Sequence, residues 1–204
     1  MNQLLFLACS PAGHESLGAQ QVLAALNDCD ALGHGIRVTT RRLAMEALAP
    51  LSAQYAQAIT SSAPSDDPAV ALSEHLLGEL EACDGLLIST PMHNFAVPAA
   101  LKLWIDYVLR KGRSFAVKPD GKVGLLRDRP VLVLVRSGSP CVGDAARQPD
   151  FLTPYLLHAL SVMGIHNVQF VYLPGLSPTT EALAQTRHAL ISFLVPSRLT
   201  GDRP

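Results

Sequence analysis

The sequence lacks the short signatures of several common site types. It contains no G-x-x-x-x-G-K-[ST] phosphate loop and no G-x-G-x-x-G dinucleotide fingerprint. Neither C-x-x-C nor C-x-x-H spacing occurs, so there is no zinc or dithiol motif. Four reduced, small packing thiols are therefore expected, although the first and last fall beside predicted loops: Cys9, Cys29, Cys83 and Cys141.

The sequence also has little net charge and no long apolar run. The 204 residues carry a net charge of −1, which gives no electrostatic footprint for nucleic acid or an anionic membrane. No apolar run approaches the roughly 18 to 20 residues that a membrane span requires. The apolar N-terminus is too short for a signal peptide core and lacks basic residues before it, which predicts a cytoplasmic protein.

The sequence is rich in apolar residues, and segments typical of strands alternate along it with segments typical of helices. With 49% hydrophobic residues, one domain over residues 1–196 is expected, followed by a disordered tail over residues 197–204. Apolar runs predict buried strands at residues 3–9, 85–88 and 131–135, and short β-branched or apolar segments predict two more strands at residues 36–40 and 168–171. Helical patterns are expected near residues 17–26, 52–59, 67–82, 98–110, 151–163 and 183–195, and Pro-Asp-Gly at 119–121 predicts a hairpin or flap.

This alternation of strands and helices implies an α/β fold. We expect a doubly wound, five-stranded parallel sheet with strand order 2-1-3-4-5, because that order has a switch point between strands 1 and 3. Ligands of such sheets bind beyond the carboxyl ends of the strands at the switch point. The segments that follow strands 1 and 3 are therefore the places to search for a site.

A small-residue loop, Ser10 to Gly18, follows the first strand and leads into a helix. A strand, a small-residue loop and a helix N-terminus together favour an anion, since unpaired N–H groups and the helix dipole both attract it. Hydroxyl groups without a lysine are better suited to a monophosphate than to a triphosphate. A second interpretation is that Ser16 simply caps the helix, and one hydroxyl can serve both purposes.

The loop after the third strand offers a thioether, an imidazole, an amide and an aromatic ring in succession: Met92, His93, Asn94 and Phe95. It lies between Pro91 and Pro98, and its position suits a flat ligand. The alternative is that Asn94 caps the next helix while Met92 and Phe95 belong to the core.

These residues resemble a known flavin-binding segment. The run P-M-H-N-F at residues 91–95, followed by Pro98, L-K at 101–102 and G-x-x-F at 112–115, is similar to that of the FMN-dependent NADH:quinone oxidoreductases, or FMN-dependent azoreductases. One position departs, since the family usually has Tyr where this chain has His93. The resemblance covers about residues 4–195 and implies a flavodoxin-like fold.

The resemblance also implies a set of FMN-binding residues. Ser10, Ser16, Leu17 and Gly18 would hold the phosphate, with Gly18 standing where the family has a second serine. The flavin ring would lie against Pro91, Met92, His93, Asn94 and Phe95. Its far edge would meet Ser137, Gly138 and Ser139, which lie in the segment 136–139 that aligns with the family's S-R-G-G. Only Gly138 is identical there, and Arg136 is given no role because it stands one position away from the family arginine.

The activity implied by the resemblance is a ping-pong transfer of two electrons. NADH or NADPH would reduce FMN, and a quinone or an azo compound would then be reduced in the same place. A homodimer is implied, with the partner completing each substrate pocket. His93 either donates a proton to the acceptor or merely fills the place of the family's Tyr. Three alternatives stay open: an FMN reductase that releases its flavin, a flavodoxin-type electron carrier, for which −1 is an unusually weak charge, and a binding module without flavin.

Overall fold

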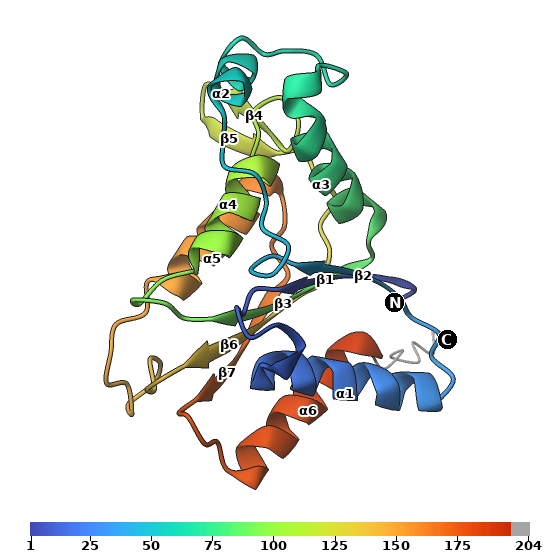
Figure 1. Ribbon diagram of the computed structural model, residues 1–204, viewed down its shortest axis with the longest axis vertical. Helices are drawn as coiled ribbons and strands as arrows, with labels where there is room; N and C mark the ends of the chain where they lie inside the picture. Colours follow the sequence, from blue (N-terminus) through green and yellow to red (C-terminus); the bar gives the residue numbers. More distant parts are fainter. Residues whose placement is uncertain (197–204) are drawn as a thin grey trace, which may run out of the picture.

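A five-stranded parallel sheet forms the middle layer of the computed structural model, which describes residues 1–196 (Figure 1). Its strand order is β2-β1-β3-β6-β7, which is the predicted order 2-1-3-4-5 with the strands of this sheet counted along the chain. The strands are β1 (Gln3–Ala8), β2 (Arg37–Arg42), β3 (Gly85–Pro91), β6 (Val131–Ser137) and β7 (Val168–Pro174). The tail predicted at residues 197–204 lies outside the described residues.

Helices cover both faces of the sheet (Figure 1). On one face lie α1 (Leu17–Ala31) and α6 (Thr180–Leu194), and on the other lie α3 (Ala71–Ala82), α4 (Ala99–Val108) and α5 (Leu152–Met163). Each face has its own core, because successive strand side chains point in opposite directions. In β1, Leu4 and Phe6 pack on the side of α1 and α6, whereas Leu5 and Leu7 pack on the side of α3, α4 and α5.

Several element ends differ from the sequence-based expectation. β3 continues to Pro91 and β6 to Ser137, although both strands were expected to end earlier. Their extra residues pair with neighbouring strands, Pro91 with Arg136 and Ser137 with Pro174. A strand's length depends on such partners, which a local apolar pattern does not reveal. The helices also shift: α1 runs to Ala31, α4 begins after Pro98, and α6 begins at Thr180.

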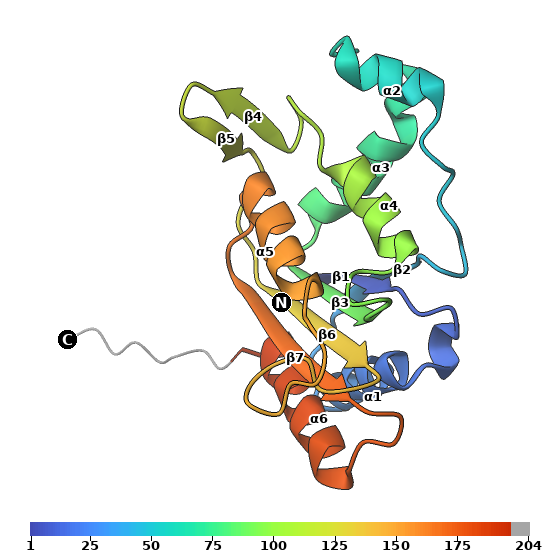
Figure 2. The same cartoon turned by 90° about the vertical axis from the view of Figure 1, so that its left-hand side faces the viewer.

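Two segments extend beyond α3, α4 and α5, away from the sheet (Figure 2). One contains α2 (Ala53–Thr60), with Ser52 as its N-cap, and a short 3-10 helix, η2 (Pro68–Val70), with Asp67 as its N-cap. The other is the antiparallel hairpin of β4 (Phe115–Lys118) and β5 (Gly121–Gly124), which confirms the predicted turn. No helix among residues 1–196 combines the length and apolar character needed to cross a membrane.

The hairpin is attached to the end of α5 through two glycines. Gly164 ends that helix with φ 98°, in the left-handed region that favours glycine. A Cβ on Gly124 would lie 2.2 Å from the Gly164 amide nitrogen, so the two backbones leave no room for a side chain. The backbone N–H of Leu126 donates to the Met163 carbonyl at 3.0 Å beside this contact. The base of the hairpin is thus held firmly against α5.

Candidate functional site

The loops that the sequence singled out meet at the carboxyl edge of the sheet. The Cys9 N–H, at the end of β1, donates to the Ser89 carbonyl of β3 at 2.9 Å. The Met92 N–H, at the end of β3, donates to the Arg136 carbonyl of β6 at 2.7 Å. Since β1, β3 and β6 are neighbours, the segments that follow them share one edge.

The loop after β1 ends in the short 3-10 helix η1 (Gly13–Glu15) and the N-cap residue Ser16. The Ser16 hydroxyl accepts from the Ala19 N–H at 3.3 Å and donates to the Gly13 carbonyl at 2.8 Å. The capping interpretation of Ser16 is therefore confirmed. In the described part of the chain, the N–H groups of Leu17 and Gly18 have no hydrogen-bond acceptor, as expected in the first turn of a helix. These two N–H groups and the helix dipole favour an anion.

Gly18 lies in close contact with β3. A Cβ at this position would come within 2.5 Å of the Ser89 hydroxyl oxygen, a separation that real side chains do not adopt. A serine at position 18, as in the family pattern, would therefore collide with Ser89. The glycine is explained by packing, and its backbone N–H remains available.

The loop after β3 is a tight turn with unusual backbone angles. His93 and Ala96 exchange two backbone hydrogen bonds of 3.0 Å each, and the residues between them have positive φ, 47° for Asn94 and 72° for Phe95. Two left-handed central residues define a type I′ turn. No acceptor for the N–H groups of Asn94 and Phe95 occurs among residues 1–196, so both are free to bind a ligand.

The alternative interpretation of this loop, in which Asn94 caps the next helix while Met92 and Phe95 belong to the core, is wrong in two respects. Pro98 stands at the N-cap of α4, which receives no side-chain capping bond, so Asn94 does not cap that helix. Phe95 is 44% exposed and does not belong to the core. Met92 alone partly fits that alternative, because it is half-buried and packs against the core on the side of α3 to α5.

A second loop, which follows β6, is tied to this turn by residues that sequence reasoning missed. The Gln148 amide nitrogen lies 3.0 Å from the Ser139 carbonyl oxygen and 3.8 Å from the Met92 sulfur, so this side chain bridges the two loops. The Phe151 N–H donates to the Phe95 carbonyl at 3.0 Å. Nothing in the sequence marks Gln148, because only the folded loops bring it between its partners.

At the end of β6, two side chains hold the loop in place and one glycine leaves space for a ligand. Ser137 is buried and donates its hydroxyl to the Ser139 carbonyl at 2.8 Å, so it shapes the loop. The Arg136 guanidinium donates to the carbonyls of Leu173 and Gly175, and burial lowers its pKa. A Cβ on Gly138, in contrast, would meet no atom within 4 Å, so a ligand can lie directly over its backbone.

Comparisons with known proteins agree with this geometry. A family model described as a flavodoxin-like fold matches residues 2–194. The FMN-dependent NADH:quinone oxidoreductase 5 of Burkholderia lata is 55% identical over 201 residues, which cover 98% of each chain. The chain belongs to the FMN-dependent NADH:quinone oxidoreductase family.

Further members and a solved structure extend the comparison. The FMN-dependent NADH:quinone oxidoreductase 4 of Pseudomonas fluorescens is 50% identical over 186 residues, or 91% of this chain and 90% of that one. An FMN-dependent NADH-azoreductase of Bacillus anthracis, solved in complex with FMN, matches with a TM-score of 0.79 over 95% of this chain and 98% of that one. Its sequence identity is 20%, so this match shows the shared fold.

The polar groups at this edge fit the FMN that names the family. The N–H groups at the start of α1 and the N-terminal helix dipole suit the phosphate. The free N–H groups of the I′ turn suit the polar edge of a flat ring, and Gly138 leaves room for it. Both ends of the cofactor thus have chemically matching groups on adjacent loops.

The remaining candidate groups are His93 and the cysteine thiols. His93 is exposed and lies at an apolar hollow of about 360 Å³, whose lining includes Leu43, Leu48 and Leu103. Burial raises the pKa of the Cys9 thiol to about 12, against a smaller lowering by Thr90, and burial also raises the pKa of Cys141. Both thiols are therefore protonated at neutral pH and are poor nucleophiles. All four cysteines are buried and free, in agreement with their predicted packing role.

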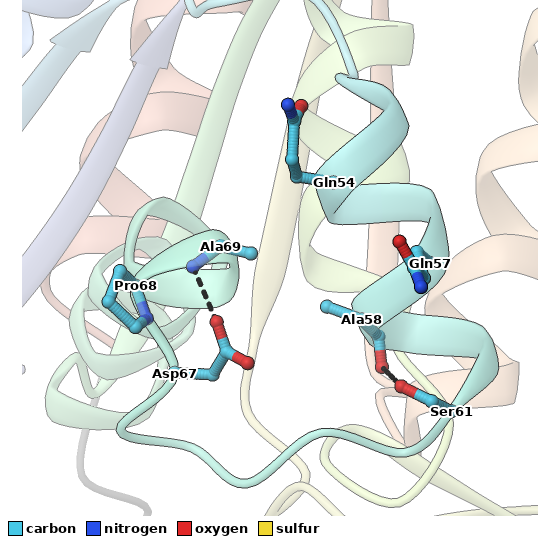
Figure 3. A pocket seen from close by; sticks show the side chains of 7 residues that line it. All are labelled: Gln54, Gln57, Ala58, Ser61, Asp67, Pro68 and Ala69. Carbon is cyan, nitrogen blue, oxygen red and sulfur yellow. Dashed lines mark hydrogen bonds between the residues drawn. The ribbon is translucent and has the colours of Figure 1, made fainter.

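A larger hollow of about 630 Å³ lies between α2 and η2 (Figure 3). Two of its polar side chains are committed to local structure. The Asp67 carboxylate accepts from the Ala69 N–H at 2.8 Å, and the Ser61 hydroxyl donates to the Ala58 carbonyl at 3.2 Å (Figure 3). None of its lining residues comes from the loops at the carboxyl edge. We assign it no chemistry.

Proposed function

We propose that this chain, as a single domain over residues 1–196, uses bound FMN to pass two electrons from NADH or NADPH to a quinone. One observation carries the proposal: free N–H groups for a phosphate and for a flat ring occur on neighbouring loops at one edge of the sheet. The names of the relatives that are 55% and 50% identical support the same activity.

The proposed roles follow the geometry of the loops. The N–H groups of Leu17 and Gly18 bind the FMN phosphate, and the hydroxyls of Ser10 and Ser16 shape the loop around it. Ser10 accepts from the Ala12 N–H at 3.2 Å, which leaves its own hydrogen free to donate. Ser16 contributes through its cap, because its one hydroxyl hydrogen is already donated to the Gly13 carbonyl.

The ring end of FMN is held by the loops after β3 and β6. The N–H groups of Asn94 and Phe95 donate to its polar edge, while Pro91, Met92 and His93 form the near wall. Ser137, Gly138 and Ser139 form the far wall, where Gly138 permits close approach. The Gln148 bridge sets the spacing between the two walls.

The chemistry of electron transfer belongs to the cofactor, which when bound accepts two electrons from a nicotinamide and gives them to an acceptor. The protein positions it and stabilises negative charge near the turn through backbone donors. His93 either donates a proton from its ring to the reduced quinone or acts only as part of the wall. Its exposure leaves it accessible to an acceptor.

We further propose that the active form is a homodimer and that azo compounds are also substrates. Two large apolar side chains beside the site, Phe95 and Phe151, are 44% and 60% exposed. A second copy of the chain would cover them and complete the substrate pocket. Light scattering coupled to gel filtration gives the mass in solution, and a monomer at every concentration would contradict this part.

The experiment for the function begins with the purified protein. A yellow protein that keeps FMN through gel filtration, is bleached by NADH under nitrogen and recovers its colour on addition of a quinone supports the proposal. A colourless protein that does not take up FMN would identify a flavin-free binding module. Loss of reduced FMN during gel filtration would indicate an FMN reductase, and bleaching without transfer to quinones would leave only an electron carrier.

A further inference from the structure

A single buried hydroxyl lies between the start of α1 and the end of β3. Ser89 is 4% exposed, and its oxygen is 2.5 Å from the position that a Cβ on Gly18 would occupy. The alternation along β3 turns Ser89 toward α1, because Leu87, two residues earlier, packs in the core beneath α1 and α6. The hydroxyl therefore points at the first turn of α1.

This hydroxyl has no hydrogen-bond partner in the part of the chain that the structure describes. A buried hydroxyl without a partner destabilises a fold, so its presence requires an explanation. Within residues 1–196, Trp104 Nε1 is the one fully covered side-chain polar atom that lacks a partner. The Ser89 oxygen therefore keeps some access to the space beside it.

The neighbouring groups are also unused donors. The N–H groups of Leu17 and Gly18 lack acceptors within the described residues, whereas the Ser16 hydroxyl already donates its only hydrogen to the Gly13 carbonyl. A ligand that accepts from these N–H groups at the start of α1 can accept from the Ser89 hydroxyl as well. One anion would satisfy all three donors at once.

We propose that the Ser89 hydroxyl is a ligand of the FMN phosphate and supplies, from β3, the hydroxyl that Gly18 lacks. This inference rests on the proposed function, because it takes FMN as the occupant of the loop. It assigns a binding role to a residue of β3 for which the sequence predicted none.

The packing shows that the hydroxyl can reside on either element but not on both. The nearest atoms to a Cβ at position 18 are the Ser89 oxygen at 2.5 Å, Arg136 Cγ at 3.5 Å and Leu134 Cδ2 at 3.9 Å. Removal of the Ser89 oxygen leaves 3.5 Å as the shortest of these distances, which is an ordinary contact. A serine at position 18 is therefore compatible with alanine at position 89 and collides with serine there.

The test uses three variants of the full chain: Ser89→Ala, Gly18→Ser and the double variant Ser89→Ala/Gly18→Ser. Flavin is removed, and the dissociation constants of FMN and riboflavin are measured by quenching of flavin fluorescence. Thermal unfolding of each apoprotein shows whether it is folded. Ser161→Ala, which removes a hydroxyl from the outer side of α5, is the matched control.

Ser89→Ala is expected to weaken FMN binding by about tenfold to a hundredfold, since it removes a hydrogen bond to a charged group. Riboflavin, which has no phosphate, should bind Ser89→Ala and the wild type equally. Gly18→Ser should unfold at a lower temperature and bind FMN weakly, and the double variant should recover FMN affinity to within about threefold of the wild type. Ser161→Ala should change neither constant.

Each failure has a separate meaning. If Ser89→Ala binds FMN as tightly as the wild type, or loses FMN and riboflavin affinity equally, the role of Ser89 is overturned while the proposed function stands. A double variant that fails to recover affinity would also overturn it. If the wild-type apoprotein binds neither flavin, the proposed function itself is overturned.

Discussion

The left-handed turn after β3 gives a sharp prediction about stability. Phe95 has φ 72°, a conformation that L-residues with a Cβ rarely adopt. Comparison of Phe95→Ala with Phe95→Gly isolates this backbone effect, because both variants lose the same half-exposed ring. We expect the glycine variant to be the more stable of the two, which reverses the usual order of alanine and glycine.

The magnitude follows from two opposing contributions. A left-handed conformation costs a residue with a Cβ about 1–2 kcal/mol, and glycine avoids this cost. Glycine also gives the unfolded chain more freedom, which destabilises the fold by about 0.4–1 kcal/mol relative to alanine. At the mid-points of these ranges, about 1.5 against about 0.7 kcal/mol, the difference favours glycine by about 0.8 kcal/mol, or roughly 2–3 °C in melting temperature for a chain of this size.

The measurement is urea unfolding of the two apoproteins without added flavin, since bound ligand would shift the apparent stability. Ala56→Gly, in the exposed part of α2, serves as the control and should lose about 1 kcal/mol. If Phe95→Ala is as stable as Phe95→Gly or more stable, residue 95 does not hold the left-handed conformation, and the I′ turn is refuted.

Three further predictions concern the site and the outer helices. Gly138→Val should leave the melting temperature of the apoprotein within about 2 °C of the wild type, because the valine side chain would enter open space. It should raise the FMN dissociation constant by about tenfold. An unchanged dissociation constant would show that Gly138 does not contact the flavin. His93→Phe should leave the pH profile of quinone reduction unchanged if His93 is only a wall residue, and the loss of an ionisation from that profile would establish proton transfer instead. Burial alone would raise the pKa of Glu74, but its bonds to Arg113 and Arg110 outweigh burial and lower the pKa below 4.5. The stability that this carboxylate contributes is thus present above about pH 4.5 and is lost as the pH falls through the lowered pKa. Glu74→Gln should therefore cost about 1.5–3 kcal/mol of unfolding free energy at neutral pH, and that free energy should fall less steeply with decreasing pH than in the wild type. An equally steep fall in the variant would contradict this.

The sheet could be predicted because its strands carry their signal locally. Buried parallel strands have apolar side chains on both faces, as residues 4–8 and 131–135 do, and their order follows from the switch-point rule. The ends of β3 and β6 could not be predicted in this way. Pro91 and Ser137 are held in strands by residues on neighbouring strands, and that pairing exists only in the folded sheet.

The site was predicted in position but less well in detail. The family motif points to residues 91–95, yet Asn-Phe is not the Asn-Gly pair that marks a type I′ turn, so the turn itself was not foreseen. Gln148 lies far along the chain from Met92, and nothing local connects the two. Ser89 carries no local signal either, since its proximity to Gly18 arises from the packing of a helix on a sheet.

The contact between α1 and β3 also constrains how this lineage can have changed over time. Because a Cβ at position 18 would lie 2.5 Å from the Ser89 hydroxyl oxygen, a substitution at position 18 requires that this hydroxyl turn away or be absent. Positions 18 and 89 are therefore expected to vary together. Homologues with a serine at position 18 should more often carry a residue without this hydroxyl at position 89.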